Sequence, residues 1–203
     1  MRYPKAEDIE EMRARGDDPT VIAEQGEHAN RRQMAEALQA AIRDAFAGVT
    51  LSAGIGLFEA AGLDARANDE TLAAYRAMDE RLDWRALAPA NLKGCSSSLS
   101  FFDAEGMRFH IPAYLIADLG DLDGSDDFGL VYTLTCGTLL HEQFAGLNAE
   151  QRDVIRAYLQ FIGEEPDPDR ISDRDRKRIQ SALADYWASS TPQAPTSSIC
   201  VPP

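Results

Sequence analysis

Residues 98–111 constrain the fold of this chain more than any other segment. Apolar residues alternate with other residues on both sides of a short turn, and the alternating set is Leu99, Phe101, Met107, Phe109 and Ile111. Alternation with a period of two is typical of strands that bury one face. Residues 103–106 begin with Asp and end with Gly, which favours a turn with Gly106 at positive φ. The sequence therefore predicts a β-hairpin over residues 98–111, with Phe101 and Phe109 facing the same core.

Two further patterns extend this prediction to a fold class. The apolar run 130–135 predicts a third strand. Most of the remaining chain has the spacing of amphipathic helices, with a long helix from about Asn30. Later helices begin at the polar caps Asn68, Asn148 and Ser172, and Asn148 forms a capping box with Gln151. The chain is thus predicted to be α+β, with roughly five or six helices packed on a small antiparallel sheet of about three strands.

Composition divides the chain into three parts. Residues 1–28 are charged and interrupted by Gly and Pro, which predicts an N-terminal extension. Residues 29–189 are predicted to form a single globular domain, because 44% of the residues in the chain are hydrophobic and can build a core. Residues 190–203 are rich in Pro, Ser and Thr and are predicted to be a disordered tail.

The sequence also predicts a compartment. Cys95, Cys136 and Cys200 have no spacing typical of a metal site, so we expect free thiols in a reducing environment. The chain begins without the apolar stretch of a secretory signal, and no apolar run reaches the roughly 18 to 20 residues that span a bilayer. A cytoplasmic protein with no membrane partner is therefore expected.

One block of the chain carries a family resemblance. Residues 100–115 read Ser-Phe-Phe-Asp-Ala-Glu-Gly-Met-Arg-Phe-His-Ile-Pro-Ala-Tyr-Leu. With Gln151-Arg152 and Tyr186-Trp187, this block resembles an uncharacterised bacterial domain-of-unknown-function family with the pattern "sFFDaeGfrFylPAyl", over roughly residues 31–188. The resemblance implies domain boundaries and no activity. The chain has His110 where that family usually has a plain aromatic residue, which speaks against a catalytic histidine.

Candidate chemical motifs are incomplete. His141-Glu142 matches half of a metalloprotease motif, but position 145 is Ala instead of a second His. Cys136 and His141 lack a recognisable third group that would orient a thiol–imidazole pair. The run from Asp121 to Asp127 resembles the start of a calcium loop, but its glycine and its later ligands do not fall in the EF-hand register. We therefore predict no metal, no cofactor and no catalytic residue.

Charge is the remaining functional signal. The net charge is −14, and residues 103–142 hold eight acidic residues against one basic residue. Such a surface repels nucleic acid and attracts basic proteins. The predicted partner-binding residues are Asp103, Glu105, Asp121, Asp123, Asp126 and Asp127. These observations favour a non-enzymatic protein that binds a basic partner, such as an immunity-type inhibitor of a basic toxin or nuclease.

Three alternatives stay open at this point. The acidic residues can serve solubility alone. A hydrolase is also conceivable, with a site near the hairpin built from His110, Asp103, Glu105 and His141. The third alternative is a regulatory or scaffold module whose two chain ends carry the binding.

Overall fold

The computed structural model describes residues 3–120, 128–136, 139–166 and 170–188. All regular secondary structure in these ranges is helical, so the predicted α+β fold with an antiparallel sheet is wrong. The long helices are α1 (Ala6–Arg15), α2 (Pro19–Ala45), α3 (Leu57–Asp64), α4 (Asp69–Met78), α6 (Ala104–Gly120), α9 (Ala149–Gly163) and α10 (Asp173–Ala184). The short ones are η1 (Trp84–Ala86), α5 (Pro89–Gly94), η2 (Ser96–Ser100), α7 (Leu130–Thr135) and α8 (Leu140–Gln143).

The predicted hairpin over residues 98–111 is instead a short 3₁₀ turn followed by α6. Asp103 stands directly before this helix, and its carboxylate accepts the N–H of Gly106 at 2.8 Å, as an N-terminal cap does. The helix is buried on several sides: Met107, Phe109, His110 and Ile111 point in different directions around its axis, and all four are buried. A helix that is apolar nearly all round has no clear helical period, so short stretches of it can alternate like a strand.

Two further expectations fail for related reasons. The predicted third strand over residues 130–135 is the short helix α7, because a six-residue apolar run fits either type of element. Gly106 is not at positive φ, since it lies inside α6. A small residue is required there for space instead, because a Cβ at Gly106 would lie 2.5 Å from the carbonyl oxygen of Ile55.

The predicted helix starts are confirmed where a polar cap marks them. Asn68 and Ser172 accept the N–H groups of Thr71 and Asp175 at the starts of α4 and α10. Asn148 and Gln151 form the predicted reciprocal capping box of α9. The long helix expected from about Asn30 is present, but it begins earlier, at Pro19, after the cap Asp18.

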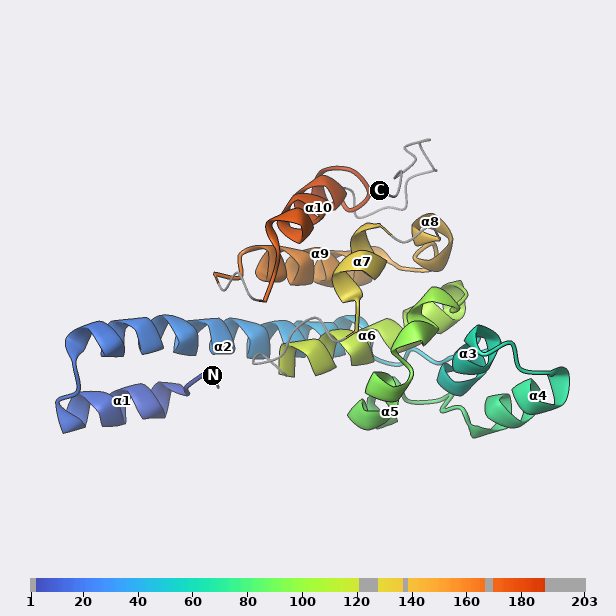
Figure 1. Ribbon diagram of the computed structural model, residues 1–203, viewed down its shortest axis with the longest axis horizontal. Helices are drawn as coiled ribbons and strands as arrows, with labels where there is room; N and C mark the ends of the chain where they lie inside the picture. Colours follow the sequence, from blue (N-terminus) through green and yellow to red (C-terminus); the bar gives the residue numbers. More distant parts are fainter. Residues whose placement is uncertain (1–2, 121–127, 137–138, 167–169, 189–203) are drawn as a thin grey trace.

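The helices are arranged around α6, as Figure 1 shows. The C-terminal half of α2 packs on α6 and on α9, while α10 packs on both α9 and α7. At one end of the molecule α1 runs back along the first half of α2, and at the other end α3 and α4 pack on each other. The predicted boundary of the N-terminal extension at residue 28 falls within α2, and the predicted tail 190–203 lies outside the described residues.

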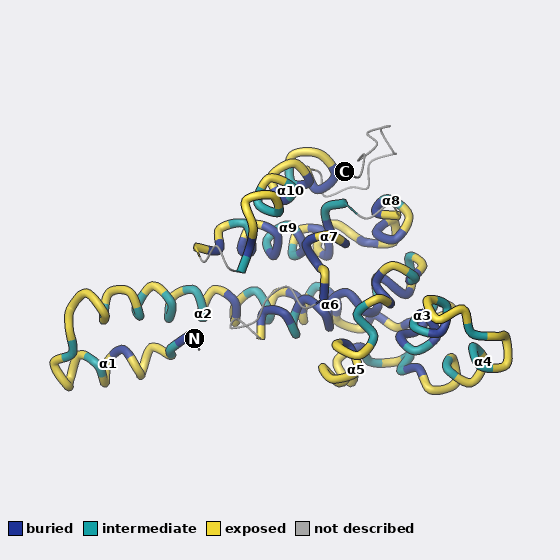
Figure 2. The backbone as a smooth tube through the Cα atoms, viewed as in Figure 1, coloured by how far each residue is buried: buried dark blue, intermediate teal, exposed yellow. Residues whose placement is uncertain are grey.

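The core lies where α2, α6 and α9 meet. Its largest fully buried aromatic side chains are Phe46, Phe102, Phe109, Tyr114, Phe144, Tyr158 and Trp187. Figure 2 shows that burial is concentrated in this region and that α1 and the first half of α2 are mostly exposed. Phe101 is only partly buried, whereas its neighbour Phe102 is 2% exposed. The prediction that Phe101 shares the core with Phe109 is therefore wrong, because Phe102 occupies the core in its place.

Candidate functional site

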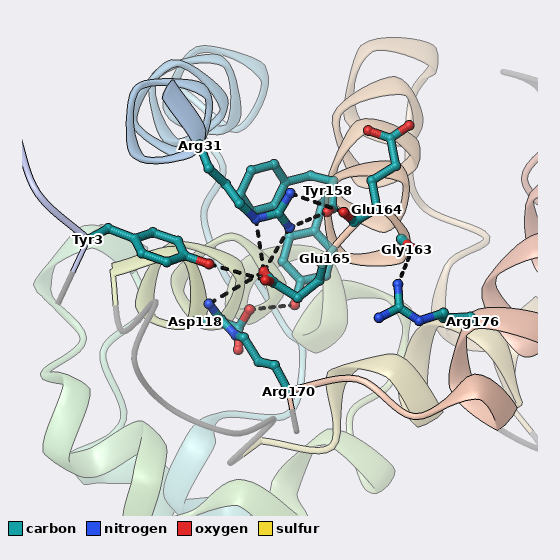
Figure 3. A network of polar contacts seen from close by, with 10 residues as sticks. Tyr3, Arg31, Asp118, Tyr158, Gly163, Glu164, Glu165, Arg170 and Arg176 are labelled. Atoms are coloured by element: carbon teal, nitrogen blue, oxygen red, sulfur yellow. Dashed lines mark hydrogen bonds and ion pairs between the residues drawn. The ribbon is translucent and has the colours of Figure 1, made fainter. Parts of the chain in front are cut away.

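A buried polar junction joins the N-terminal segment to the end of α9 (Figure 3). Glu165, which is 1% exposed, lies at its centre. The Nε of Arg31 donates to Oε2 of Glu165 at 2.9 Å, and Arg170 approaches the same oxygen at 3.8 Å. The hydroxyl of Tyr3 donates to Oε1 at 3.1 Å. Side chains from opposite ends of the sequence thus share one carboxylate.

The cation Arg31 also fixes the backbone around this carboxylate. Its NH2 group donates to the carbonyl of Phe161 at 2.7 Å, and its guanidinium lies 4.1 Å from the centre of the Phe161 ring. Burial raises the pKa of the Tyr3 hydroxyl above its usual range, and the neighbouring Glu165 carboxylate acts in the same direction. Tyr3 therefore remains a hydrogen-bond donor at neutral pH. The junction is built to hold two segments together.

A small cavity adjoins the junction. Its volume is about 20 Å³, which is room for one water molecule and not for a substrate. Its polar walls are Asp118, Tyr158, Glu165 and Arg170, and the Tyr158 hydroxyl donates to Asp118 at 2.8 Å. Its apolar walls come from Val131, Ile162 and Ile171. The arrangement supports structure and offers no space for chemistry.

The predicted partner-binding residues fall into two groups. Asp103 and Glu105 are exposed, but both carboxylates accept backbone N–H groups of the loop that precedes α3. Asp103 accepts from Ile55 and Glu105 from Ala53, each at 3.1 Å. These two residues therefore have a structural role at the start of α6. The other four, Asp121, Asp123, Asp126 and Asp127, lie outside the described residues.

The residues of the alternative hydrolase site do not form an accessible constellation. Asp103, Glu105 and His110 come together at the start of α6, but His110 is 0% exposed. A general base must reach within hydrogen-bond distance of its substrate, which this histidine cannot do in this structure. His141 lies in α8, where its ring packs edge-on against Tyr186 at 4.7 Å.

The two described cysteines, Cys95 and Cys136, have different surroundings. Burial raises the pKa of the Cys95 thiol, and Asp79 adds to this effect, so Cys95 is not a thiolate at neutral pH. Cys136 accepts a hydrogen bond from the Thr135 hydroxyl at 3.6 Å. Within the described ranges no three His, Cys, Asp or Glu side chains gather closely enough to hold a metal ion.

An acidic surface outside the predicted set is formed by α1 and the first half of α2. We call residues 5–30 the acidic arm. They contain eight acidic residues against three basic ones: Glu7, Asp8, Glu10, Glu11, Asp17, Asp18, Glu24 and Glu27, with Lys5, Arg13 and Arg15. The sequence marks this segment as charged, but its exposure depends on how α1 folds back on α2, which the local pattern does not indicate.

The arm is an ordered helical hairpin. Gly16 ends α1 with φ of 75°, a conformation that suits glycine, and Asp18-Pro19 begins α2. Ile9 is buried between the two helices, and Arg32 donates to the carbonyl of Tyr3 at 3.1 Å. Together with the junction at Glu165, these contacts fix the direction of the arm relative to the core.

No helix among the described residues is both long enough and apolar enough to cross a bilayer.

Comparison with curated proteins and with solved structures finds no match to the chain. A family model described as a family of unknown function, DUF6714, matches residues 34–191, well over half of the chain. The whole acidic arm, residues 5–30, therefore precedes the matched region. The chain belongs to the DUF6714 family.

Proposed function

We propose that this protein is a non-enzymatic acidic protein that binds a basic protein partner. An immunity-type inhibitor of a basic toxin or nuclease is the concrete case. The observation that carries the proposal is the acidic arm, an ordered and exposed surface with an excess of carboxylates. The proposed binding surface also includes the acidic residues 121–127, on the strength of their sequence alone.

The electrostatics of the arm support this assignment. Two exposed ion pairs, Glu10 with Arg13 and Arg15 with Asp17, neutralise part of its charge. Four further exposed carboxylates have no ion pair within the described residues: Glu7, Glu11, Glu24 and Glu27. Uncompensated surface charge of one sign steers an oppositely charged partner and raises the association rate. A surface that is already ordered also loses less conformational entropy on binding.

Neutralising the arm tests the proposal. We expect the triple change Glu11→Gln, Glu24→Gln and Glu27→Gln to slow association with the partner by about tenfold at low ionic strength. The partner is first captured with the full chain from the cells that produce it, identified by mass spectrometry, and then followed by stopped-flow fluorescence. The difference should shrink as salt shortens the Debye length to about 8 Å at physiological ionic strength.

A matched control separates the arm from net charge. Asp64→Asn, Asp69→Asn and Glu70→Gln remove the same number of exposed carboxylates around α3 and α4, at the opposite end of the molecule. This variant should associate at nearly the wild-type rate. The proposal fails if the two triple variants slow association equally, or if no basic protein is retained at low salt.

The acidic residues 121–127 give a second test. If these residues form a solvated recognition surface, replacing Asp121, Asp123, Asp126 and Asp127 with Asn should leave the melting temperature nearly unchanged, because solvated carboxylates contribute little to folding. Association at low salt should slow by about tenfold or more if these residues contact the partner. A calcium-dependent thermal shift that is lost in the variant would assign them to metal binding instead. If neither property changes, these residues serve solubility.

A further inference from the structure

His110 is held in its neutral form inside α6. Its Nδ1–H donates to the carbonyl of Gly106 at 2.7 Å, so Nε2 carries the lone pair. Nε2 is buried and has no hydrogen-bond partner among the described residues. The ring stacks on Phe102 with centroids 4.3 Å apart and meets Phe109 edge-on at 5.0 Å. A proton on Nε2 would place a charged N–H against apolar rings without an acceptor.

The charged groups that face His110 come from two neighbouring elements. Arg81, in the turn after α4, disfavours a positive imidazole. Asp103, before α6, favours one, but its Oδ1 already accepts the N–H groups of Ile55 and Gly106. Burial is the largest effect and lowers the pKa of His110 to about 4. A charged His110 would therefore lie near Asp103 and Arg81 without an acceptor for Nε2, and both of these residues hold the loop before α3.

That loop, residues 51–56, packs on the first turn of α6, and we call this contact the seat. Glu105 accepts the N–H of Ala53, and Gly106 lies so close to Ile55 that a Cβ there would meet its carbonyl oxygen at 2.5 Å. Arg81 donates to the carbonyls of Ser52 and Gly54 in this loop. His110 lies one helical turn after Gly106, and a charge on its ring would act on Asp103 and Arg81, the two side chains that hold the loop.

The α3–α4 unit, residues 57–78, depends on this seat. No residue of α4 is buried, and α4 packs mainly against α3 at the edge of the molecule (Figure 1). Asp79, the residue directly after α4, accepts the N–H of Phe58 at 2.7 Å and so joins the two helices of the unit. The start of α3 is tied to η2 by the Ser98 hydroxyl, which donates to the carbonyl of Leu57 at 3.0 Å. Burial in this unit is confined to α3, where Leu57, Glu59, Ala60 and Gly62 are buried, and a unit held through one short helix is expected to open before the rest of the core.

We propose that protonation of His110 under mildly acidic conditions releases the α3–α4 unit from α6 while α2, α9 and α10 stay packed. Burial disfavours the proton in the closed state, and His110 regains its ordinary affinity for the proton once the seat opens. The closed state is therefore fully favoured above about pH 6.5 and loses its advantage as the pH falls towards about 4. With these two pKa values, the ratio of open to closed molecules rises about 30-fold between about pH 7.5 and pH 5.

Amide hydrogen exchange of the full chain tests this device. After correction for the intrinsic pH dependence of exchange, amides of residues 57–78 should lose protection by about tenfold or more between about pH 7.5 and pH 5. Amides of α9, residues 149–163, should keep theirs. In His110→Phe, whose ring can still stack on Phe102, the regional loss should vanish. His28→Phe and His141→Phe should behave like the wild type.

Two results would overturn the proposal. One is a wild-type loss of protection that is equal in residues 57–78 and in α9. The other is an unchanged regional loss in His110→Phe. If His110→Phe does not fold, NMR titration of the wild-type imidazole decides: a pKa far below the ordinary 6.5 supports the device, and a value near 6.5 rejects it.

Discussion

The Glu165→Gln variant should lose about 3 to 5 kcal/mol of the free energy of unfolding, because it removes a buried charge that two guanidiniums share. Arg31 and Arg170 are 12% and 9% exposed and both lie within 4 Å of the Glu165 carboxylate. A neutral amide cannot balance their charge, and it also presents N–H donors to groups that are donors themselves. Urea unfolding followed by circular dichroism measures the loss.

Glu164→Gln is the matched control for this experiment. Glu164 is the adjacent residue and is exposed, so its variant should stay within about 0.5 kcal/mol of the wild type. Equal losses in the two variants, or a loss below about 1 kcal/mol for Glu165→Gln, would show that the junction does not stabilise the fold.

The Phe109→Ala variant should lose about 3 to 5 kcal/mol of stability, because it opens a cavity in the core beneath α6. Phe109 is 0% exposed and its ring meets that of His110 at 5.0 Å. Neighbouring core side chains on α6 are held in position by the helix backbone and can fill the space only in part. Thermal and chemical unfolding of the purified variant give the measurement.

Phe101→Ala distinguishes the helical structure from the hairpin expected from the sequence. In a hairpin Phe101 and Phe109 share one buried face, and both changes have similar effects. In the structure Phe101 is only partly buried, so its replacement should cost clearly less than that of Phe109. A loss for Phe101→Ala as large as that for Phe109→Ala would contradict the helical packing.

Some parts of the fold can be predicted from the sequence, and others cannot. Helix starts marked by Asn68, Asn148 and Ser172 are predicted correctly, because a cap is a contact between residues three positions apart. The first half of α6 is mistaken for a hairpin, because its burial depends on α2 and on α8, which contact it from far away in the sequence. The contact between Tyr3 and Glu165 spans 162 positions and leaves no local signal at either residue.

The residues behind the family resemblance turn out to be structural. Arg152 is fully buried, lies 4.8 Å from the ring of Trp187 and donates to the carbonyl of Tyr186 at 2.7 Å. Asp103 caps α6, and Gly106 permits the close approach of the loop before α3. A pattern composed of such residues describes the packing of the fold, which is why no candidate site could be predicted from it.

The junction at Glu165 has a consequence for how this chain is divided. The family match begins at residue 34, so it excludes both Tyr3 and Arg31. A chain trimmed to that boundary would keep the buried carboxylate and lose two of the groups that hold it, one of which, Arg31, also covers the ring of Phe161. The limit of sequence similarity and the limit of cooperative folding therefore differ in this protein. The family match begins inside α2, whereas the folded unit includes Tyr3, which precedes α1.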